Sequence, residues 1–219
     1  MEIDFITNQH KKTKRNYLER VNKLNKAECA IKAKKWSYDY WDGSRDICYG
    51  GYSYDGRWEP IAKKMIEHYK LKPDSKILDV GCGKGFLLYE FKKLLPECEV
   101  KGLDISSYAI KNAKDEIKKN LILGNANNLP FEKNYFDLVI SLNTLHNLYC
   151  FDLKKALSEV ERVSKSNKYI CIESYRNEFE KMNLLYWQVT CECFFTPEEW
   201  KWWFDLAGYK GDHSFIYFE

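Results

Sequence analysis

A short apolar run followed by closely spaced glycines constrains this 219-residue chain more than any other feature. Lys76-Ile77-Leu78-Asp79-Val80 has the composition of a buried strand, and it leads directly into Gly81-Cys82-Gly83-Lys84-Gly85 and an apolar stretch with helical spacing. Glycines are needed where the backbone turns tightly and approaches a ligand without interference from a Cβ atom. The pattern therefore predicts a strand, loop and helix that together bind a nucleotide-like ligand.

The chain after residue 75 alternates between strand and helix patterns. Strands separated by helices of 10–15 residues are typical of an α/β fold with a parallel sheet and helices on both faces. The predicted strands are 76–80, 99–103, 120–123, 136–141, 168–173 and a terminal 213–218, and the predicted helices are 84–95, 106–119, 152–165, 177–189 and 197–207.

The first 70 residues differ in character from the rest. Residues 8–35 have the spacing of one long polar helix, residues 36–58 are rich in Gly, Asp, Tyr and Trp, and Glu59-Pro60 opens a helix to about residue 70. We therefore expect an N-terminal arm and aromatic lid over 1–70 and a core over 71–219 with an insertion at about 174–195. The arm, residues 1–35, carries ten Lys and Arg against four Asp and Glu. A solvated helix face explains this charge better than a phosphate-seeking tail.

Composition narrows the class of protein. No apolar run reaches the roughly 20 residues of a membrane span, and the first residues lack a signal-peptide layout. The eight cysteines show no paired metal-ligand spacing, so we expect no metal and reduced thiols in the cytoplasm. The net charge of +3 is too small to imply nucleic-acid binding.

Two acidic residues indicate which ligand the glycine loop binds. Asp104 ends the second strand nineteen residues after Gly85, where a carboxylate can accept hydrogen bonds from ribose hydroxyls. The spacing G-x-G-x-G differs from the dinucleotide pattern, and Asp79 before it would repel a pyrophosphate. An acid at that place suits the ammonium or sulfonium side of S-adenosylmethionine.

Four segments, ILDVGCGKG, GLDIS, GNANNLPF and YFDLVIS, together resemble the successive cofactor motifs of class I S-adenosylmethionine-dependent methyltransferases. The resemblance spans residues 76–141 and implies a Rossmann-like sheet. It also implies that Asp104 holds the ribose, that Ile105 packs on the adenine, and that Asn125 accepts from the adenine amine, although Asn125 could instead only shape a turn. The cofactor contacts that we expect in this region are Asp79, Gly81, Cys82, Gly83, Asp104, Ile105, Asn125, Ala126 and Ser141.

The segment from Ser141 to Asn147 should face the transferred methyl group in such a protein. It contains neither the Asn-Pro-Pro-Tyr element of amide and adenine-amine methyltransferases nor the Pro-Cys of pyrimidine C5-methyltransferases, which favours a small-molecule acceptor. His146 is the best candidate base, because its pKa lies near the working pH. A structural role for His146 is the competing interpretation.

The lid and the insertion supply candidate contacts to the methionine portion and to the acceptor. Arg57 could pair with the methionine carboxylate and Tyr52 could pack nearby, with Tyr49 beside the acceptor, unless these aromatics only plug the sheet edge. Tyr175 and Arg176 suit an anionic or polyhydroxylated acceptor, although Arg176 could be a surface salt-bridge residue.

The segments 36–58, ESYR and LLYWQ are similar to methyltransferases of bacterial capsule and O-antigen clusters. This similarity implies an oxygen of a sugar, nucleotide-sugar or phosphoramidate-type precursor of surface polysaccharide as the acceptor. The alternatives are a small amine, an RNA bound by the basic arm, a nicotinamide-dependent reductase and a binding-only sensor. Few residues follow the last helix, so the sheet could have an open edge that supports a homodimer.

Overall fold

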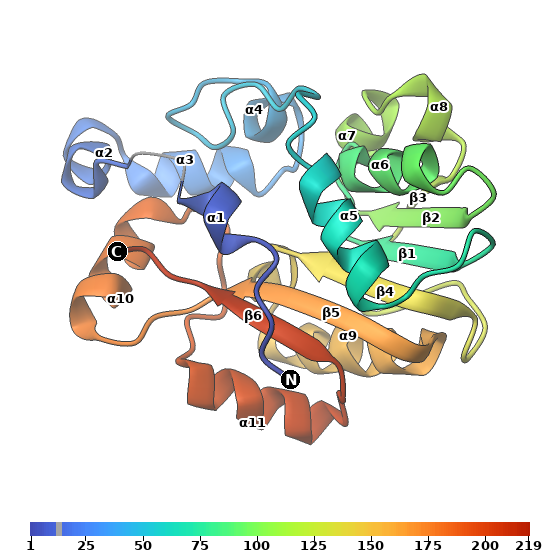
Figure 1. Cartoon of the computed structure of the whole chain (residues 1–219). Helices are drawn as coiled ribbons and strands as arrows, with labels where there is room; N and C mark the ends of the chain where they lie inside the picture. Colours follow the sequence, from blue (N-terminus) through green and yellow to red (C-terminus); the bar gives the residue numbers. More distant parts are fainter. Residues whose placement is uncertain (12–14) are drawn as a thin grey trace.

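The computed structural model describes residues 1–11 and 15–219. In these residues, six parallel strands form one sheet in the order β3-β2-β1-β4-β5-β6 (Figure 1). Their bounds are Lys76–Val80 (β1), Glu99–Asp104 (β2), Leu121–Leu123 (β3), Phe136–Leu142 (β4), Ser164–Glu173 (β5) and Asp212–Ile216 (β6). The order reverses between β1 and β4, and open α/β sheets bind ligands at the carboxyl ends of the strands beside such a point.

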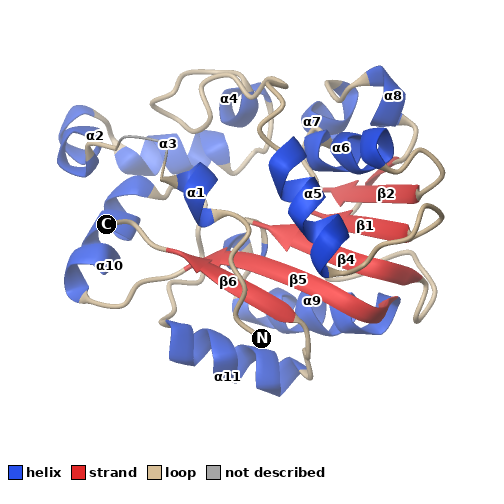
Figure 2. Ribbon diagram, in the orientation of Figure 1, coloured by secondary structure: helices blue, strands red, loops and turns tan. Residues whose placement is uncertain are grey.

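Helices cover both faces of the sheet (Figure 2). Ile77 and Leu138 belong to a core cluster with α5 (Glu59–His68) and α6 (Phe86–Leu94), whereas Leu78 and Val139 belong to a cluster with α9 (Cys150–Val163) and α11 (Pro197–Ala207). The alternation follows from the two-residue side-chain period of a strand, because each strand is buried on both faces. The predicted α/β fold is confirmed.

The predicted helix 106–119 is wrong. Two short helices, α7 (Ser107–Lys111) and α8 (Asp115–Lys118), take its place, because the backbone of Lys114 is extended. The other boundaries differ by a few residues. The predicted strand 168–173 begins earlier, at Ser164, and the predicted helix 177–189 is α10 (Glu178–Trp187). A 3₁₀ turn, η1 (Leu145–Asn147), follows β4.

The predicted single helix over 8–35 is also wrong, and its residues 12–14 lie outside the described part. The arm instead contains α1 (Thr7–His10), α2 (Tyr17–Lys23) and α3 (Lys26–Ala33). Asn25 explains the break between the last two, because its side chain accepts hydrogen bonds from the backbone N–H groups of Ala27 and Glu28. An asparagine in this N-cap position starts a new helix.

The lid, residues 36–58, lies with α3 above the carboxyl ends of the strands and contains α4 (Tyr38–Trp41) (Figure 1). Two side-chain contacts attach it to the core. Trp41 Nε1 donates to Ser106 Oγ at 2.9 Å, and Lys84 Nζ lies 2.7 Å from both carboxylate oxygens of Asp42. The lid is therefore an integral wall of the space above the sheet.

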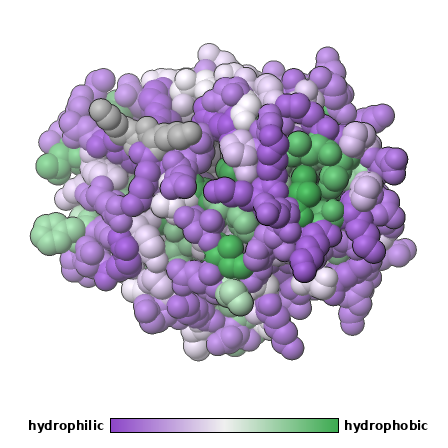
Figure 3. Space-filling view, in the orientation of Figure 1, coloured by the Kyte–Doolittle hydropathy of each residue, from purple (hydrophilic) through white to green (hydrophobic). Residues whose placement is uncertain are grey.

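The outer edge of β6 is partly covered. Ile3 N donates to His213 O and His213 N donates to Met1 O, both at 2.9 Å. The edge that we expected to be open for a dimer is thus paired here with the start of the arm. β6 runs parallel to β5. The face seen in Figure 3 is mostly hydrophilic with scattered apolar patches. In the described residues, no helix is long and apolar enough to cross a membrane.

Candidate active site

Three neighbouring cavities lie at the carboxyl edge of the sheet, and all three are lined by Tyr49 of the lid and Asn143 after β4. We call them by their linings. The apolar cavity has a volume of about 290 Å³, the glycine-loop cavity about 170 Å³ and the basic cavity about 330 Å³. Because all three share these two residues, the cavities lie next to one another.

The apolar cavity is lined by Leu103, Ile105 and Ala126 on the sheet side and by Trp36 and Trp41 of the lid. This slot between aromatic and aliphatic side chains suits a flat ring. Three residues that sequence reasoning missed, Thr144, Tyr149 and Asp152, complete its wall.

Asn125 lines the apolar cavity, but its side chain serves a turn. Its Oδ1 accepts a hydrogen bond from Asn127 N at 3.2 Å, as the alternative interpretation expected. Asp152 is held nearby by Asn127, whose Nδ2 donates to Asp152 Oδ1 at 2.7 Å. The cavity therefore has an acceptor group that was not predicted.

Asp104 connects the apolar cavity to the glycine loop. Its Oδ2 accepts from Gly83 N and its Oδ1 accepts from Ser106 N, both at 2.7 Å. Burial raises the pKa of Asp104, and the backbone N–H groups of Ser106 and Gly83 counteract this shift. The carboxylate holds the loop in place and presents its edge to the apolar cavity.

The glycine loop leaves no space for side chains at two of its positions. Gly81 has φ +81°, and a Cβ atom there would lie 2.6 Å from Thr144 Cβ. Gly83 has φ +55°, and its Cβ would lie 2.7 Å from the Trp41 ring. Gly81, Cys82 and Gly83 all line the glycine-loop cavity. The backbone can therefore approach a ligand closely here.

Asp79 lies buried at the end of the glycine-loop cavity. Within the described residues its Oδ1 has no hydrogen-bond partner. Burial raises the pKa of Asp79 to about 8, and the charge of Asp104 adds to the shift. An unpartnered buried carboxyl group that lines a cavity is well suited to a ligand cation.

Ser141 does not reach any of the three cavities. It is fully buried between strands, where its Oγ donates to Val80 O at 2.9 Å. Leu142 and Asn143, the next two residues, line the cavities instead. The prediction of a cofactor contact at Ser141 is therefore not supported, because strand β4 continues one residue further than expected and Ser141 faces its neighbour β1.

The lid brings Tyr49, Tyr52 and Arg57 together. The Tyr49 ring is parallel to that of Trp41 at a centroid distance of 5.3 Å, and Tyr52 Oη accepts from Trp58 Nε1 at 3.0 Å. Arg57 lines both the basic and the glycine-loop cavities, and its Nε donates to Asp55 Oδ1 at 2.8 Å. Its guanidinium thus already has one carboxylate partner, and it keeps further N–H donors.

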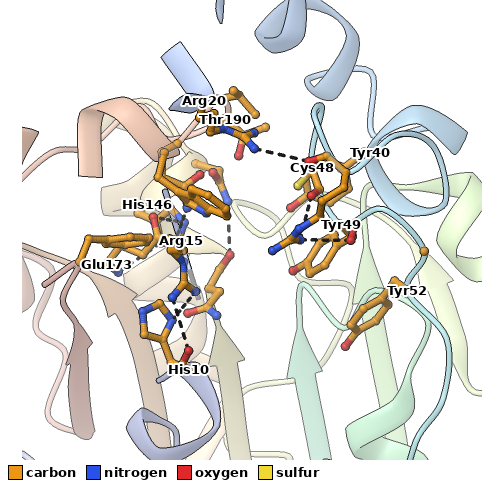
Figure 4. A pocket seen from close by; sticks show the side chains of 18 of the residues that line it. His10, Arg15, Arg20, Tyr40, Cys48, Tyr49, Tyr52, His146, Glu173 and Thr190 are labelled. Carbon is orange, nitrogen blue, oxygen red and sulfur yellow. Dashed lines mark hydrogen bonds and ion pairs between the residues drawn. The ribbon is translucent and has the colours of Figure 1, made fainter. Parts of the chain in front are cut away.

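Arginines dominate the basic cavity. Arg15 and Arg20 come from the arm and Arg45 and Arg57 from the lid, and all four line it together with Glu173 and His146. Figure 4 shows Arg15 beside Glu173 and His146. Sequence reasoning assigned no ligand role to Arg15, Arg20 or Arg45. The interpretation of the basic arm as a solvated helix face is wrong for its two arginines, which line a cavity.

His146 and Glu173 form a buried pair in the wall of the basic cavity. His146 Nδ1 accepts a hydrogen bond from Glu173 N at 3.4 Å, so the imidazole proton belongs on Nε2. Burial lowers the pKa of His146 to about 3 and raises that of Glu173 to about 8. Oε1 of Glu173 accepts from Gln188, and its Oε2 has no hydrogen-bond partner within the described residues.

Tyr175 and Arg176 lie away from these cavities, contrary to the predicted contact with an acceptor. Arg176 pairs with Glu180 and, at 2.8 Å, with Glu219, and its guanidinium lies over the Tyr217 ring. Strand β5 ends at Glu173, and the surface salt bridge left open by the sequence is the arrangement found for Arg176. Tyr175 packs beside Lys181.

Comparisons to known proteins show the family of the chain and agree with its fold. A family model described as "Methyltransferase domain" matches residues 71–208, and the chain belongs to this family of methyltransferases. The family implies S-adenosylmethionine as its cofactor. The residues present fit that group, because the orphaned Asp79 carboxyl faces a cavity whose glycines approach without Cβ atoms.

Two curated relatives illustrate the range of the family. A demethylmenaquinone methyltransferase of Symbiobacterium thermophilum is 34% identical over 54% of this chain and 50% of its own length. An Arabidopsis thaliana tRNA (carboxymethyluridine(34)-5-O)-methyltransferase is 35% identical over 59% of this chain and 30% of its own length. The chain thus spans half or less of these relatives.

A solved structure of a putative methyltransferase from Bacillus halodurans shares the fold. Its TM-score is 0.55 at 20% identity, over 67% of this chain and 68% of that one. At this identity the likeness concerns the fold alone, so the acceptor has to be argued from the site.

Proposed function

We propose that this protein transfers a methyl group from S-adenosylmethionine to an oxygen of a small polar acceptor bound in the basic cavity. The observation that carries the proposal is the shared wall formed by Tyr49 and Asn143, because it brings the acceptor cavity next to the two donor cavities. A sugar, nucleotide-sugar or phosphoramidate-type precursor of surface polysaccharide is the acceptor that we favour, since it combines hydroxyl groups with negative charge.

Different residues of the chain bind the different parts of S-adenosylmethionine. The Asp104 carboxylate would accept from the ribose hydroxyls, and Ile105, Ala126 and Trp41, which line the apolar cavity, would enclose the adenine. Asp79 balances the ammonium group, and Arg57 lies beside the same cavity for the carboxylate. The cofactor supplies a methyl group already activated by a sulfonium, so the protein has to orient the acceptor and exclude water.

A hydroxyl acceptor has to lose its proton as it attacks, and Glu173 is better suited to take it than His146. His146 stays neutral with a pKa of about 3, whereas Glu173 lines the same cavity and has a pKa of about 8, and its Oε2 has no hydrogen-bond partner among the described residues. A base works best when its pKa lies near the operating pH. His146 then acts by positioning Glu173 through the backbone N–H.

The linings of the cavities disfavour the two alternative acceptors. A small amine binds as a cation before it loses its proton, and four arginines in the wall would repel it. An RNA would need basic residues on an open surface, but Arg15 and Arg20 face a cavity of about 330 Å³.

Two measurements test the proposal in sequence. Calorimetry should show binding of S-adenosylmethionine, and labelled cofactor offered with nucleotide sugars, sugar phosphates, phosphoramidates and amines should yield a methylated product found by mass. Methylation of an anionic, hydroxyl-bearing member supports the proposal. Failure to bind the cofactor would refute it, and methylation of amines alone would refute the oxygen assignment.

A further inference from the structure

Arg20 and Arg45 differ from other arginines in their partners. Arg57, Arg162 and Arg176 each pair with a carboxylate. Arg20 instead donates to the main-chain oxygens of Arg45 and Ile47 at 3.4 and 3.0 Å, and Arg45 donates to those of Cys48 and Tyr49 at 3.0 and 3.1 Å. Over residues 1–11 and 15–219, neither forms an ion pair, and the nearby Asp46 pairs with Lys23.

Three guanidinium groups, including those of Arg20 and Arg45, lie close together around the ring of Trp187. The guanidinium carbons of Arg15, Arg20 and Arg45 lie 5.3, 4.6 and 5.4 Å from its centroid. Burial lowers the pKa of Arg20, and the charge of Arg45 acts in the same direction. Guanidinium groups remain protonated in proteins nevertheless. The cluster is therefore a concentration of positive charge at the wall of the basic cavity.

Little negative charge in the cavity opposes this cluster. Among the described residues that line it, Glu173 is the one carboxyl group. Burial raises its pKa to about 8, so it is mostly protonated at neutral pH. Asp55 lies outside the lining and pairs with Arg57. An anionic ligand in the basic cavity would therefore balance the positive charge of Arg20 and Arg45.

We infer that the basic cavity binds a phosphate ester group of the acceptor between Arg20 and Arg45, beside Trp187. A guanidinium carries five N–H donors, and two hydrogen bonds to carbonyls leave donors on both arginines. A phosphate has enough oxygens to bind two separate guanidiniums, whereas a carboxylate is satisfied by one bidentate arginine. The inference rests on the proposed function only in assigning the phosphate to the acceptor.

This placement also orients the acceptor. With its phosphate against the arm and the lid, the remainder of the molecule extends past Glu173, which lines the basic cavity, toward Asn143, which the basic cavity shares with the donor cavities. A hydroxyl group is thereby directed to the carboxyl that takes its proton. The arm selects the acceptor and the core performs the transfer.

Inorganic phosphate is a probe that needs no knowledge of the acceptor. Calorimetry at constant ionic strength should show that phosphate binds the full chain and that acetate binds far more weakly. Arg20→Gln and Arg45→Gln should each weaken phosphate binding at least about tenfold, the loss expected from one hydrogen bond to a charged group. Arg176→Gln is the matched control, because its guanidinium lies outside the cavity, and it should leave phosphate binding unchanged.

Two further variants guard against a disturbed lid, since Arg20 and Arg45 also bind lid carbonyls. Arg20→Lys and Arg45→Lys keep the charge and should retain more phosphate affinity than the glutamine variants. S-adenosylhomocysteine binding, measured in the same samples, reports separately on the donor site. Equal weakening by Arg176→Gln, or unchanged phosphate binding in both glutamine variants, would overturn the phosphate site. Phosphate binding by a wild-type chain that does not bind S-adenosylhomocysteine would count against the proposed function and leave the phosphate site standing.

Discussion

Glu173 Oε2 lies 3.4 Å from His146 Nε2, and the Glu173 backbone N–H donates to Nδ1 of the same imidazole. Glu173 ends β5 and His146 follows β4. The parallel pairing of these two strands brings the residues together at the carboxyl edge of the sheet. The sequence suggested His146 as a base or as a structural residue and assigned no role to Glu173. The imidazole is a neutral support, and the carboxyl group faces the acceptor cavity.

Glu173→Gln should lower kcat by about 10²-fold or more, the usual contribution of a positioned base. In the wild type, kcat should rise with pH through about 8, because the carboxylate form accepts the proton. The glutamine variant should lack this rise. Rates of methyl transfer from pH 6 to 9 with the acceptor found in the panel measure both effects, and a variant that keeps the wild-type profile would remove Glu173 from the reaction.

His146→Asn should slow turnover less than Glu173→Gln and leave cofactor affinity unchanged. An asparagine can still accept from the Glu173 N–H but cannot place a ring beside its carboxyl group. The pH at which kcat rises should shift, since the surroundings of Glu173 change. His146→Ala should be slower than His146→Asn, and equal rates for both variants and the wild type would leave His146 without a positioning role.

Asp79→Asn should change how the stability of the cofactor-free chain depends on pH. The folded pKa of Asp79 is raised to about 8, so its contribution to stability is complete below the unfolded pKa of about 4 and is lost as pH rises through 8. Between pH 5 and 8.5 the wild type should therefore lose about 2–4 kcal/mol more unfolding free energy than Asp79→Asn. Urea denaturation at both pH values measures this, and parallel declines would contradict it.

Gly81→Ala should destabilise the fold more than Gly208→Ala. Both glycines have a positive φ, but a Cβ atom at Gly208 meets no atom within 4 Å, whereas one at Gly81 clashes with Thr144. The backbone term costs about 1–2 kcal/mol in each variant, and overpacking adds about 1–3 kcal/mol at Gly81 alone. Chemical denaturation of both variants gives the comparison, and equal losses would show that Thr144 moves aside freely.

Asp104→Ala should abolish cofactor binding, because it removes the ribose acceptor and the side chain that holds Gly83 N. Asp104→Asn should bind weakly, since its amide oxygen can replace one of the two acceptors. Asp115→Ala is the control, as that carboxylate is 95% exposed. Calorimetry with S-adenosylmethionine tests the series, and near-normal affinity in Asp104→Ala would place the ribose elsewhere.

Periodicity and spacing predicted the strands of the sheet and the glycine loop because each is local in sequence. The strand 76–80, its glycines and Asp104 are within thirty residues of one another, and parallel pairing with β2 is the natural outcome. The failures at 106–119 and 8–35 arose where one residue changes the backbone. Asn25 signals its helix start by its type, whereas nothing about Lys114 requires an extended backbone.

The acceptor site could not be predicted in the same way, because it is assembled from distant segments. Arg20, Arg45 and Trp187 meet only because the arm and the lid fold back over α10. A basic arm has the same composition whether its arginines face water or a cavity. The predicted cofactor contact of Ser141 was not found for a geometric reason. A shift of one or two residues along a strand decides which side chain reaches the end of that strand.

Tyr49 belongs to the walls of all three cavities and stacks on Trp41. A single ring that touches both ligands makes their binding equilibria interdependent. If the occupied donor site holds the Tyr49 ring in place, the acceptor meets a wall that is already ordered and binds more tightly. By reciprocity, the bound acceptor then raises the affinity for the donor by the same factor. The same coupling would apply to product release, because the departure of one product would lower the affinity for the other.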